Sequence, residues 1–261
     1  MHIELETEKF LTGITPVCVS ADSHAGLVRL LNEDSFGYHI EPGAPAVLAV
    51  IADGIGGHES GNIASNLCVR LLLNSWRNLD FKQSKTVEEW GDFMLAEIEK
   101  ANVTIYNINE IYQIQHPMGT TVVSAIFLKD VVLIAHAGDS RCYRLRDENL
   151  QQLTDDHSFV AELVRKNILS PEEAHTHPFA HIISKSVGPI QEMKPDLNKF
   201  TREAGDIYLF CTDGLTGHVS DDEIKEVLLT ASKPEEAVRT LLNKALHGGG
   251  EDNITIVCVF T

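Results

Sequence analysis

Basic residues are scarce in this chain of 261 residues, which contains 21 lysines and arginines against 38 aspartates and glutamates and carries a formal net charge of −17. Nucleic acids and anionic membranes both attract positively charged protein surfaces. The charge balance therefore argues against a nucleic-acid partner and against a membrane partner.

Cysteines and long apolar runs are also few. The five cysteines are odd in number, lack CxxC spacing and lie mostly inside apolar segments, which is typical of small buried hydrophobes in a reducing compartment. No segment approaches the roughly 18 consecutive apolar residues that a membrane-spanning helix needs. Residues 1–10 are acidic rather than a basic-then-apolar leader, so we expect a soluble, cytoplasmic protein.

No internal repeat, low-complexity tract or flexible linker divides the chain. With 43% hydrophobic residues it can form a sizeable core, and we expect one domain over residues 1–261. Strand-like runs lie at about 15–20, 35–40, 46–53, 120–128, 131–138, 141–146, 207–213 and 254–260. Short gaps between several of these runs predict antiparallel hairpins, with a hairpin turn at 41–45 and a helix exit at 247–250.

Helical periodicity is clearest over residues 62–79, and a second long helix is expected over about 87–111. Serine followed three residues later by glutamate is a helix-start signature, which occurs at Ser170 and Ser220 and again at Ser232. Strands that cluster in sequence, together with groups of helices, favour sheet-on-sheet packing with helices over the outer faces.

Four aspartates lie at the ends of apolar, strand-like runs. Asp53, Asp139 and Asp213 follow such runs, and each has a glycine next to it, whereas Asp252 precedes one. Carboxylates gathered at sheet ends would repel one another, so they need raised pKa values or a cation between them. Hard divalent cations with oxygen ligands are the simplest solution.

Phosphoryl transfer is one reaction that such a site could carry out. Two metal ions held by carboxylates neutralise phosphoryl oxygens and activate a water molecule as nucleophile near neutral pH. We interpret Asp53 as the ligand that bridges two ions, with the Gly54 carbonyl as a further ligand. Asp213 and Asp252 complete the coordination of one ion.

A further acidic pair, Glu33 and Asp34, is interpreted as support for the other ion. Arg29 lies five residues before Asp34. Its guanidinium could bind two phosphate oxygens with paired hydrogen bonds. On its own this arginine would be a solvated charge, and its spacing from Asp34 is what favours a role in the site.

Six segments follow one another in a recognisable order: residues 26–34 (GLVRLLNED), 52–58 (ADGIGGH), 118–121 (MGTT), 136–141 (HAGDSR), 212–215 (TDGL) and 249–255 (GGEDNIT). In content and order they resemble the motifs of bacterial metal-dependent protein phosphatases, the type-2C family. The resemblance covers roughly residues 14–260, and six ordered motifs make a chance agreement very improbable.

This resemblance implies an α+β fold, namely a four-layer α/β/β/α sandwich of two antiparallel sheets flanked by helices. It implies hydrolysis of phosphoserine and phosphothreonine in proteins by a water that bridges Mg²⁺ or Mn²⁺ ions, without a phosphoenzyme. The expected partners are phosphorylated proteins, among them a bacterial serine/threonine kinase and its targets, and we expect a monomer.

The resemblance also assigns residues. The family's binuclear ligands are matched by Asp53, Gly54, Asp213 and Asp252. Its acidic pair is matched by Glu33 and Asp34, and its phosphate-binding arginine by Arg29. Asp139 matches the aspartate that, with Asp213, holds a third and weaker ion in bacterial members. The segment from about 154–187 corresponds to the family's flap, a variable region beside the site that is linked to substrate choice.

The chain departs from the family pattern at two positions. His24 stands where many members have an aspartate, so whatever that aspartate stabilises is achieved differently here. Ile55 stands where eukaryotic relatives have a histidine that acts as the general acid, and bacterial members commonly have a hydrophobic residue at this position. The proton donor to the leaving group is therefore unassigned, with His58 the nearest candidate and a metal-bound water the alternative.

Several candidate residues have plain structural explanations. The spacing of His175, His177 and His181 suits no single helical face, so we expect no zinc site there. His136, inside an apolar run, is expected to be a core histidine with its hydrogen bonds satisfied. Residues 118–121 are expected to be structural, with Gly119 permitting close packing before a strand. Asp139 could alternatively turn a hairpin between two strands.

Two rival functions are less consistent with the sequence. A pseudophosphatase would bind phosphoproteins without turnover, but such proteins usually lose a metal carboxylate and this chain keeps all of them. A two-metal phosphodiesterase would use similar ligands but should have a basic substrate groove, which the net charge of −17 disfavours.

Overall fold

The central strands are apolar throughout because they are buried on both faces. In β4 (Val47–Ala52), Leu48 and Val50 face one hydrophobic core, while Ala49 and Ile51 face another. Successive side chains of a strand point to opposite faces, so a strand between two cores has no polar face. The computed structural model describes residues 8–10, 17–40, 44, 46–56, 60–83, 85–170, 173–174 and 177–261.

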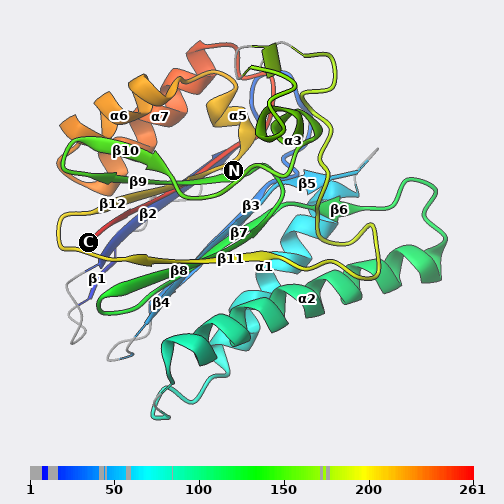
Figure 1. The fold of residues 1–261 in the computed structure, drawn as a ribbon, viewed down its shortest axis with the longest axis horizontal. Helices are drawn as coiled ribbons and strands as arrows, with labels where there is room; N and C mark the ends of the chain where they lie inside the picture. Colours follow the sequence, from blue (N-terminus) through cyan, green and yellow to red (C-terminus); the bar gives the residue numbers. More distant parts are fainter. Residues whose placement is uncertain are drawn as a thin grey trace.

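Within the described residues the strands form two large antiparallel sheets that lie face to face (Figure 1). The strand order of the first sheet is β1 (Glu8–Phe10), β2 (Val17–His24), β13 (Ile254–Phe260), β12 (Ile207–Cys211), β9 (Arg141–Arg146) and β10 (Asn149–Gln152). The order of the second is β11 (Asp196–Thr201), β8 (Val131–Ala137), β7 (Val122–Phe127), β4 and β3 (Ser35–Ile40). A short pair, β5 (Gly54–Ile55) and β6 (Gly119–Thr120), lies beside them.

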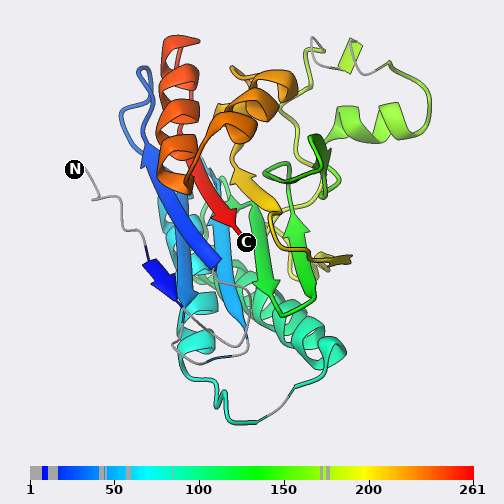
Figure 2. The same cartoon turned by 90° about the vertical axis from the view of Figure 1, so that its left-hand side faces the viewer.

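Helices cover the outer face of each sheet. α1 (Gly61–Arg77) and α2 (Val87–Tyr112) pack on the second sheet, and α6 (Asp221–Thr230) and α7 (Pro234–His247) pack on the first (Figures 1 and 2). The predicted four-layer α/β/β/α sandwich is therefore confirmed.

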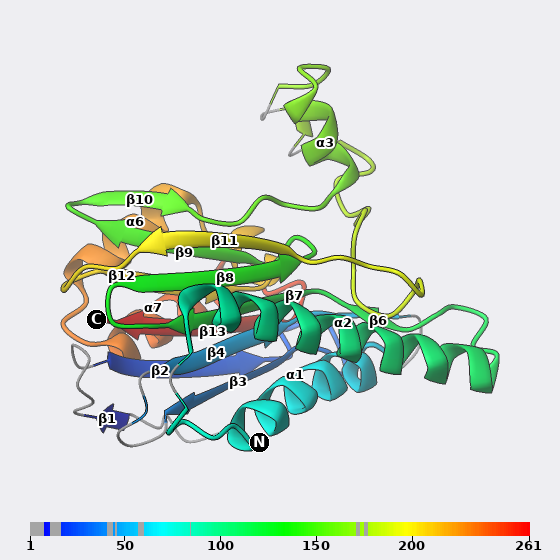
Figure 3. The same cartoon turned by 60° about the horizontal axis from the view of Figure 1, so that its bottom comes forward.

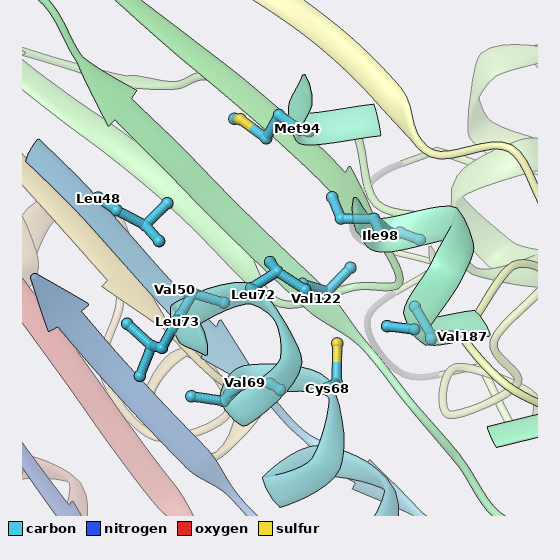
Figure 4. Close-up of a cluster of buried hydrophobic side chains, with 14 of the residues drawn as sticks. Leu48, Val50, Cys68, Val69, Leu72, Leu73, Met94, Ile98, Val122 and Val187 are labelled. Carbon is cyan, nitrogen blue, oxygen red and sulfur yellow. The ribbon is translucent and has the colours of Figure 1, made fainter. Parts of the chain in front are cut away.

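The apolar side chains of α1 and α2 pack in a core on the outer face of the second sheet. Cys68 and Leu72 of α1 and Ile98 of α2 lie against Val50 and Val122 of the second sheet (Figure 4). These side chains are almost fully buried. Residues three or four apart share one helix face, so the apolar stripe of α1 forms part of this core, as predicted.

The predicted strands are found, two of them to the residue, at β3 and β9. Among the described residues, the edge strands β1, β10 and β11 were missed, as was the short strand β5. β11 has the sequence DLNKFT, in which polar residues dominate because much of an edge strand faces solvent. Such a strand lacks the apolar run that identified the central ones.

Two of the three predicted helix starts are confirmed. Ser220 forms both hydrogen bonds of a capping box with Glu223, and Ser170 and Glu173 exchange the same two bonds. The helix predicted after Ser232 is present as α7, but the predicted cap is wrong, since α7 begins at Pro234 and its cap is Lys233. Proline at the first helical position sets this start, because its fixed φ suits a helix and its missing N–H costs nothing there.

Three further predictions concern a hairpin, the end of a helix and the cysteines. The hairpin between β3 and β4 is present in their antiparallel pairing, but most of the connecting residues 41–45 lie outside the described residues. α7 ends at His247, as the glycines after it predicted. All five cysteines are free thiols, and four of them are buried.

The segment around α3 (Phe159–Arg165) extends away from the sandwich (Figure 3). It belongs to residues 154–187, the predicted flap, of which 171–172 and 175–176 lie outside the described residues. Within the described part of the chain, no helix combines the length and apolar character needed to cross a membrane.

Candidate functional site

Five aspartates lie where strands of both sheets end at one edge of the sandwich. Asp34 precedes β3, Asp53 follows β4, Asp139 lies just beyond β8, Asp213 begins α5 (Asp213–Thr216) after β12, and Asp252 lies just before β13. Adjacent strands are antiparallel, so the start of one strand lies beside the end of its neighbour. Residues far apart in the sequence therefore meet at this edge.

The electrostatics of Asp53 show that the cluster is a single group. Burial raises the pKa of Asp53 well above its usual value, and the charges of the other four aspartates raise it further. Proximity of like charges is the second of these causes, so the five carboxylates lie within reach of one another.

Asp34 is the most deeply buried member of the cluster, with 8% of its surface exposed. Burial, together with the charges of Asp213 and Asp252, raises its pKa to about 7, although the Thr212 hydroxyl donates a hydrogen bond of 2.9 Å to Oδ2. Within the described residues its other oxygen, Oδ1, is buried without a hydrogen-bond partner. A buried carboxylate oxygen without a donor is suited to a cation.

Asp139 and Asp213 form the outer side of the cluster. Burial raises the pKa of Asp139 to about 7, and the charges of Asp213 and Asp156 add to this. Asp213 keeps an exposed face, yet the surrounding protein reduces its hydration, which together with the charge of Asp252 raises its pKa. Neighbouring carboxylates repel one another when all of them are ionised. Hard divalent cations, which prefer oxygen ligands, would relieve this repulsion.

Gly54 is required by the close approach of three backbone segments. A Cβ on this residue would lie 2.4 Å from the carbonyl atoms of Gly61 and 2.5 Å from the carbonyl oxygen of Glu33. The Glu33 carboxylate accepts a hydrogen bond of 3.1 Å from the Gly61 N–H, the first residue of α1. Glu33 therefore ties the site to the positive end of that helix.

The backbone of Asp53 is held by the threonines of the MGTT segment. Its N–H donates to Thr121 Oγ1 (2.9 Å), and its carbonyl accepts from the N–H of Thr121 (2.8 Å) and from Thr120 Oγ1 (2.7 Å). A Cβ on Gly119 would lie 2.8 Å from Pro189, so close packing at this glycine is confirmed. The structural part of this motif is to hold Asp53 in place.

Asn253 is a residue of the site whose role sequence reasoning missed. Its Nδ2 donates to the carbonyls of Ala25 and Leu31, both at 2.9 Å, and its Oδ1 accepts from the Glu33 N–H at 2.7 Å. One buried side chain thus fixes both ends of the loop that carries Arg29. Its place in the segment 249–255, directly after Asp252, was the signal in the sequence.

Arg29 lies at the mouth of the cluster. One of its guanidinium nitrogens is 2.8 Å from Oδ2 of Asp252, and about half of the arginine side chain is exposed. An exposed ion pair of this kind adds little stability. The guanidinium is therefore available to an incoming anion.

His24, the last residue of β2, makes a hydrogen bond in the turn that follows it. Its Nδ1 accepts a hydrogen bond of 2.9 Å from the N–H of Gly26, which has a φ of +80°. An aspartate at this position could accept the same bond with Oδ1, as Asx turns do. His24 therefore offers the Gly26 N–H an acceptor of the kind that an aspartate would also provide.

The hairpin alternative for Asp139 is wrong. β8 belongs to the second sheet and β9 to the first, so residues 138–140 cross between the sheets rather than turn a hairpin. Gly138 has a φ of +114°, and a Cβ there would lie 2.5 Å from the side chain of Thr121. The crossing brings Asp139 to the cluster.

A cavity of about 710 Å³ adjoins the cluster, between Asp139 and Asp213 on one side and the flap on the other. Arg141 and Asp156 form a two-pronged ion pair in its wall, and Arg165 and His181 line it from the flap. A substrate bound at the aspartates could extend into this space.

The predictions about the histidines have different outcomes. His58 and His175 lie outside the described residues, and among the described ones neither His177 nor His181 belongs to a group that could hold a metal. His136 is buried as predicted, with Nε2 close to the backbone of Asp155, but its Nδ1 has no hydrogen-bond partner within the described residues. The prediction that its hydrogen bonds are satisfied is therefore wrong for one nitrogen, because the apolar strand environment offers it no partner.

Comparisons with known proteins agree with this architecture. The model of the family described as protein phosphatase 2C matches residues 23–247. The serine/threonine phosphatase stp of Listeria welshimeri is 37% identical over 90% of this chain and 92% of its own length, and protein phosphatase PhpP of Streptococcus pneumoniae is 35% identical over 92% and 96%. Both relatives thus match nearly from end to end.

Solved structures extend the agreement to three dimensions. The serine/threonine phosphatase of S. agalactiae has a TM-score of 0.87 at 36% identity, covering 94% of this chain and 99% of that one. The catalytic domain of the phosphatase PstP in complex with two manganese ions has a TM-score of 0.79 at 34% identity, covering 94% and 97%. Fold and site together define a protein serine/threonine phosphatase. The chain belongs to the protein phosphatase 2C family.

Proposed function

We propose that this phosphatase hydrolyses phosphoserine and phosphothreonine in proteins at a centre of two Mn²⁺ or Mg²⁺ ions bound to the aspartate cluster. The observation that carries the proposal is the convergence of five aspartates that raise one another's pKa values, beside an arginine at the mouth of the site. When bound, the ions would neutralise phosphoryl oxygens and supply an activated water as nucleophile.

The proposed ligands follow from the placement of the donors. They are Glu33, Asp34, Asp53, the Gly54 carbonyl, Asp213 and Asp252. Asp139, with Asp213, would hold a third and weaker ion. The buried, unpaired Oδ1 of Asp34 and the mutual repulsion of the carboxylates are both relieved by cations. The structure of PstP with two manganese ions supports the metal and the number.

Arg29 is proposed to bind the phosphoryl group. Its guanidinium would move from Asp252 to two phosphate oxygens, exchanging one ion pair for a charge-assisted, two-pronged contact. Asn253 would keep the loop in place during this exchange through its three hydrogen bonds. The proton donor to the leaving group stays a prediction, with His58 or a water as candidates.

The proposal extends to the setting of the reaction. One domain over residues 1–261, with a flap at about 154–187, would act as a monomer in the cytoplasm. It would reverse the work of a serine/threonine kinase on that kinase and its targets. The absence of a membrane-spanning helix among the described residues and the names of the relatives are compatible with this setting.

The test is phosphate release from a phosphothreonine peptide with added Mn²⁺. We expect turnover that a chelator abolishes and that Asp213→Asn reduces by at least about 1,000-fold, as loss of a metal ligand should. Asp130→Asn is the matched control, because this exposed aspartate lies in the β7–β8 turn at the opposite end of the sheet. It should retain the activity of the wild type.

Two results would contradict the proposal. A folded, metal-loaded wild type without turnover would favour the pseudophosphatase. Preference for a phosphodiester over a phosphomonoester would favour the diesterase.

A further inference from the structure

His157 connects the base of the flap to the turn that carries Asp139. Its N–H donates to the carbonyl of Gly138 at 2.9 Å, and its Nδ1 accepts from the N–H of Gly138 at 3.1 Å. Gly138 thus has both of its backbone polar groups bonded to one residue of the flap. Asp139 is the next residue along the chain.

The far side of the same ring is anchored as firmly. His157 Nε2 lies 3.1 Å from Oδ2 of Asp196, the first residue of β11, and Lys185 forms an ion pair with the same carboxylate. The carbonyl of His157 accepts a hydrogen bond of 2.8 Å from the N–H of Ser184. The two ends of the flap are therefore joined to each other and to the second sheet through His157.

The hydrogen bonds determine the state of the ring. Gly138 N–H is a donor, so Nδ1 must carry a lone pair, and the proton of a neutral imidazole must then lie on Nε2, where it is donated to Asp196. Burial and the neighbouring Lys185 lower the pKa of His157, which favours this neutral form. Every polar atom of the ring has a defined partner.

The turn that this network supports is a tight one. Gly138 has a φ of +114° and packs against Thr121, the residue that also holds the backbone of Asp53. Asp139 has no comparable anchor of its own among the hydrogen bonds described here, whereas Asp34 receives one from Thr212. Its position depends on the residues on either side of it, namely Gly138 and Ser140, whose hydroxyl lies 2.7 Å from Thr121 Oγ1.

We propose that His157 is a positioning residue, which through Gly138 sets the place of Asp139 and thereby the affinity of the site for the weakly held third ion. This inference rests on the proposed metal centre. It assigns His157 no contact with substrate. A partner that orients a metal ligand typically changes metal affinity by about 10- to 100-fold when it is removed.

A separate metal site at these side chains is the main alternative. One ligand atom from each of His136, His157 and Asp196 lies within 4.8 Å of the others, and the two imidazole rings are stacked. The hydrogen bond from Gly138 occupies Nδ1 of His157 and leaves the proton on Nε2, and the Lys185 ammonium already neutralises Asp196. Both facts oppose a cation there.

Three substitutions separate the two sides of the ring. His157→Asn keeps an acceptor near the position of Nδ1, His157→Gln keeps a donor near the position of Nε2, and His157→Ala removes both. Calorimetric titration of metal-stripped protein with Mn²⁺ measures each class of site without turnover. We expect Ala and Gln to weaken the weakest site by about tenfold or more, and Asn to restore much of the loss.

The matched control is His116→Ala, an exposed histidine in the loop after α2, which should titrate as the wild type does. Thermal unfolding of each metal-stripped variant would show that it is folded, and kcat and KM for a phosphothreonine peptide would be measured in parallel. Loss of metal affinity in a folded variant, with KM for the peptide at saturating Mn²⁺ little changed, is the expected signature.

Three outcomes would overturn the inference. These are a wild type that binds no weak third ion, a His157→Ala variant that titrates as the wild type does, and Zn²⁺ binding that disappears with His136→Ala as well as with His157→Ala. Failure of the proposed function would show separately, as absence of peptide hydrolysis. The Mn²⁺ titration does not depend on that activity.

Discussion

At the residue scale, the site consists of carboxyl groups whose pKa values lie well above those of aspartates in water. Asp34 and Asp139 both have pKa values of about 7 because they are buried and lie near other carboxylates. An aspartate in an unfolded chain has a pKa of about 3.9. The metal-free protein therefore stores electrostatic repulsion that cations can release.

This repulsion predicts a pH dependence for the metal-free protein. Between about pH 4 and 7 the folded state holds protons at Asp34 that the unfolded chain has lost, so its contribution to stability is complete below about pH 4 and is lost as the pH rises to 7. His136 and His157, whose pKa values burial lowers, act in the opposite direction as the pH falls below about 6.5, the usual pKa of histidine.

A substitution isolates the effect of the aspartate. Asp34→Asn should be stabilised relative to the wild type as the pH rises from 5 to 7.5, with a limiting slope of about 1.4 kcal/mol per pH unit. Urea unfolding in a chelator at both pH values measures it. A difference between the two proteins that does not vary with pH would contradict the shifted pKa. Mn²⁺ should reverse the order at pH 7.5.

His24 supports a second prediction at this scale. His24→Asp retains an acceptor for the Gly26 N–H and should keep wild-type stability and activity, whereas His24→Leu loses the bond and should be destabilised by about 0.5–1.5 kcal/mol. Denaturant unfolding and peptide turnover compare the two variants. Equal losses in both would mean that the turn does not depend on this acceptor.

At the scale of elements, the loop between β2 and β3 is an ordered structure whose shape is imposed from outside it. Asn253, just before β13, makes three hydrogen bonds to the backbone of this loop. Arg29 lies between the bonded residues and makes its own ion pair with Asp252. Asp252 and Asn253, which are neighbours in the sequence, thus hold the Arg29 side chain and the backbone of a remote loop.

Replacing Asn253 should therefore affect Arg29 without touching it. Asn253→Ala leaves two carbonyls and one N–H without partners and should lower stability by about 1–3 kcal/mol. It should also raise KM for a phosphopeptide more than it lowers kcat, since the loop that we propose to bind phosphate is loosened. Asn149→Ala, at an exposed position in β10, is the matched control. Unchanged KM would separate Asn253 from phosphate binding.

At the scale of the whole molecule, charge separates substrates. A net charge of −17 repels acidic peptides and attracts basic ones over distances of about a Debye length, roughly 10 Å at 0.1 M salt. The cavity beside the cluster contains Arg141 and Arg165, but Arg141 is neutralised by Asp156. The field of the whole surface should therefore prevail over the few cations near the site.

Two phosphothreonine peptides, one flanked by lysines and one by glutamates, would test this field. The basic peptide should have the higher kcat/KM at 20 mM salt, and the difference should shrink as salt rises to 0.5 M, because screening removes long-range attraction. An uncharged phosphopeptide should respond little to salt. A preference that persists at high salt would instead indicate direct contacts in the cavity.

Much of the fold could be predicted because buried segments have characteristic patterns of apolar residues. The central strands are continuous apolar runs because both faces are covered, and α1 repeats its apolar residues with the period of a helix. β10 and β11 could not be recognised, since edge strands are held by backbone hydrogen bonds that any residue type can make.

The candidate metal ligands could likewise be predicted from the sequence, because carboxylates beside glycines at strand ends form a recognisable pattern. The residues that position them were not. Asn253, Thr121 and His157 act through hydrogen bonds to backbone groups up to 228 positions away along the chain, as between Asn253 and Ala25. Amide, hydroxyl and imidazole groups occur throughout any protein, and only their partners distinguish these three.

The sequence by itself determined the layered fold, the ordered motifs and the identity of the acidic residues, because residue type and spacing decide which segments can be buried and which groups can bind a cation. Only the tertiary structure decided that Asp139 crosses between two sheets, that His24 closes a turn, and that one histidine joins the flap to the acidic cluster. Those facts depend on distances between remote segments, which form only when the two sheets pack together.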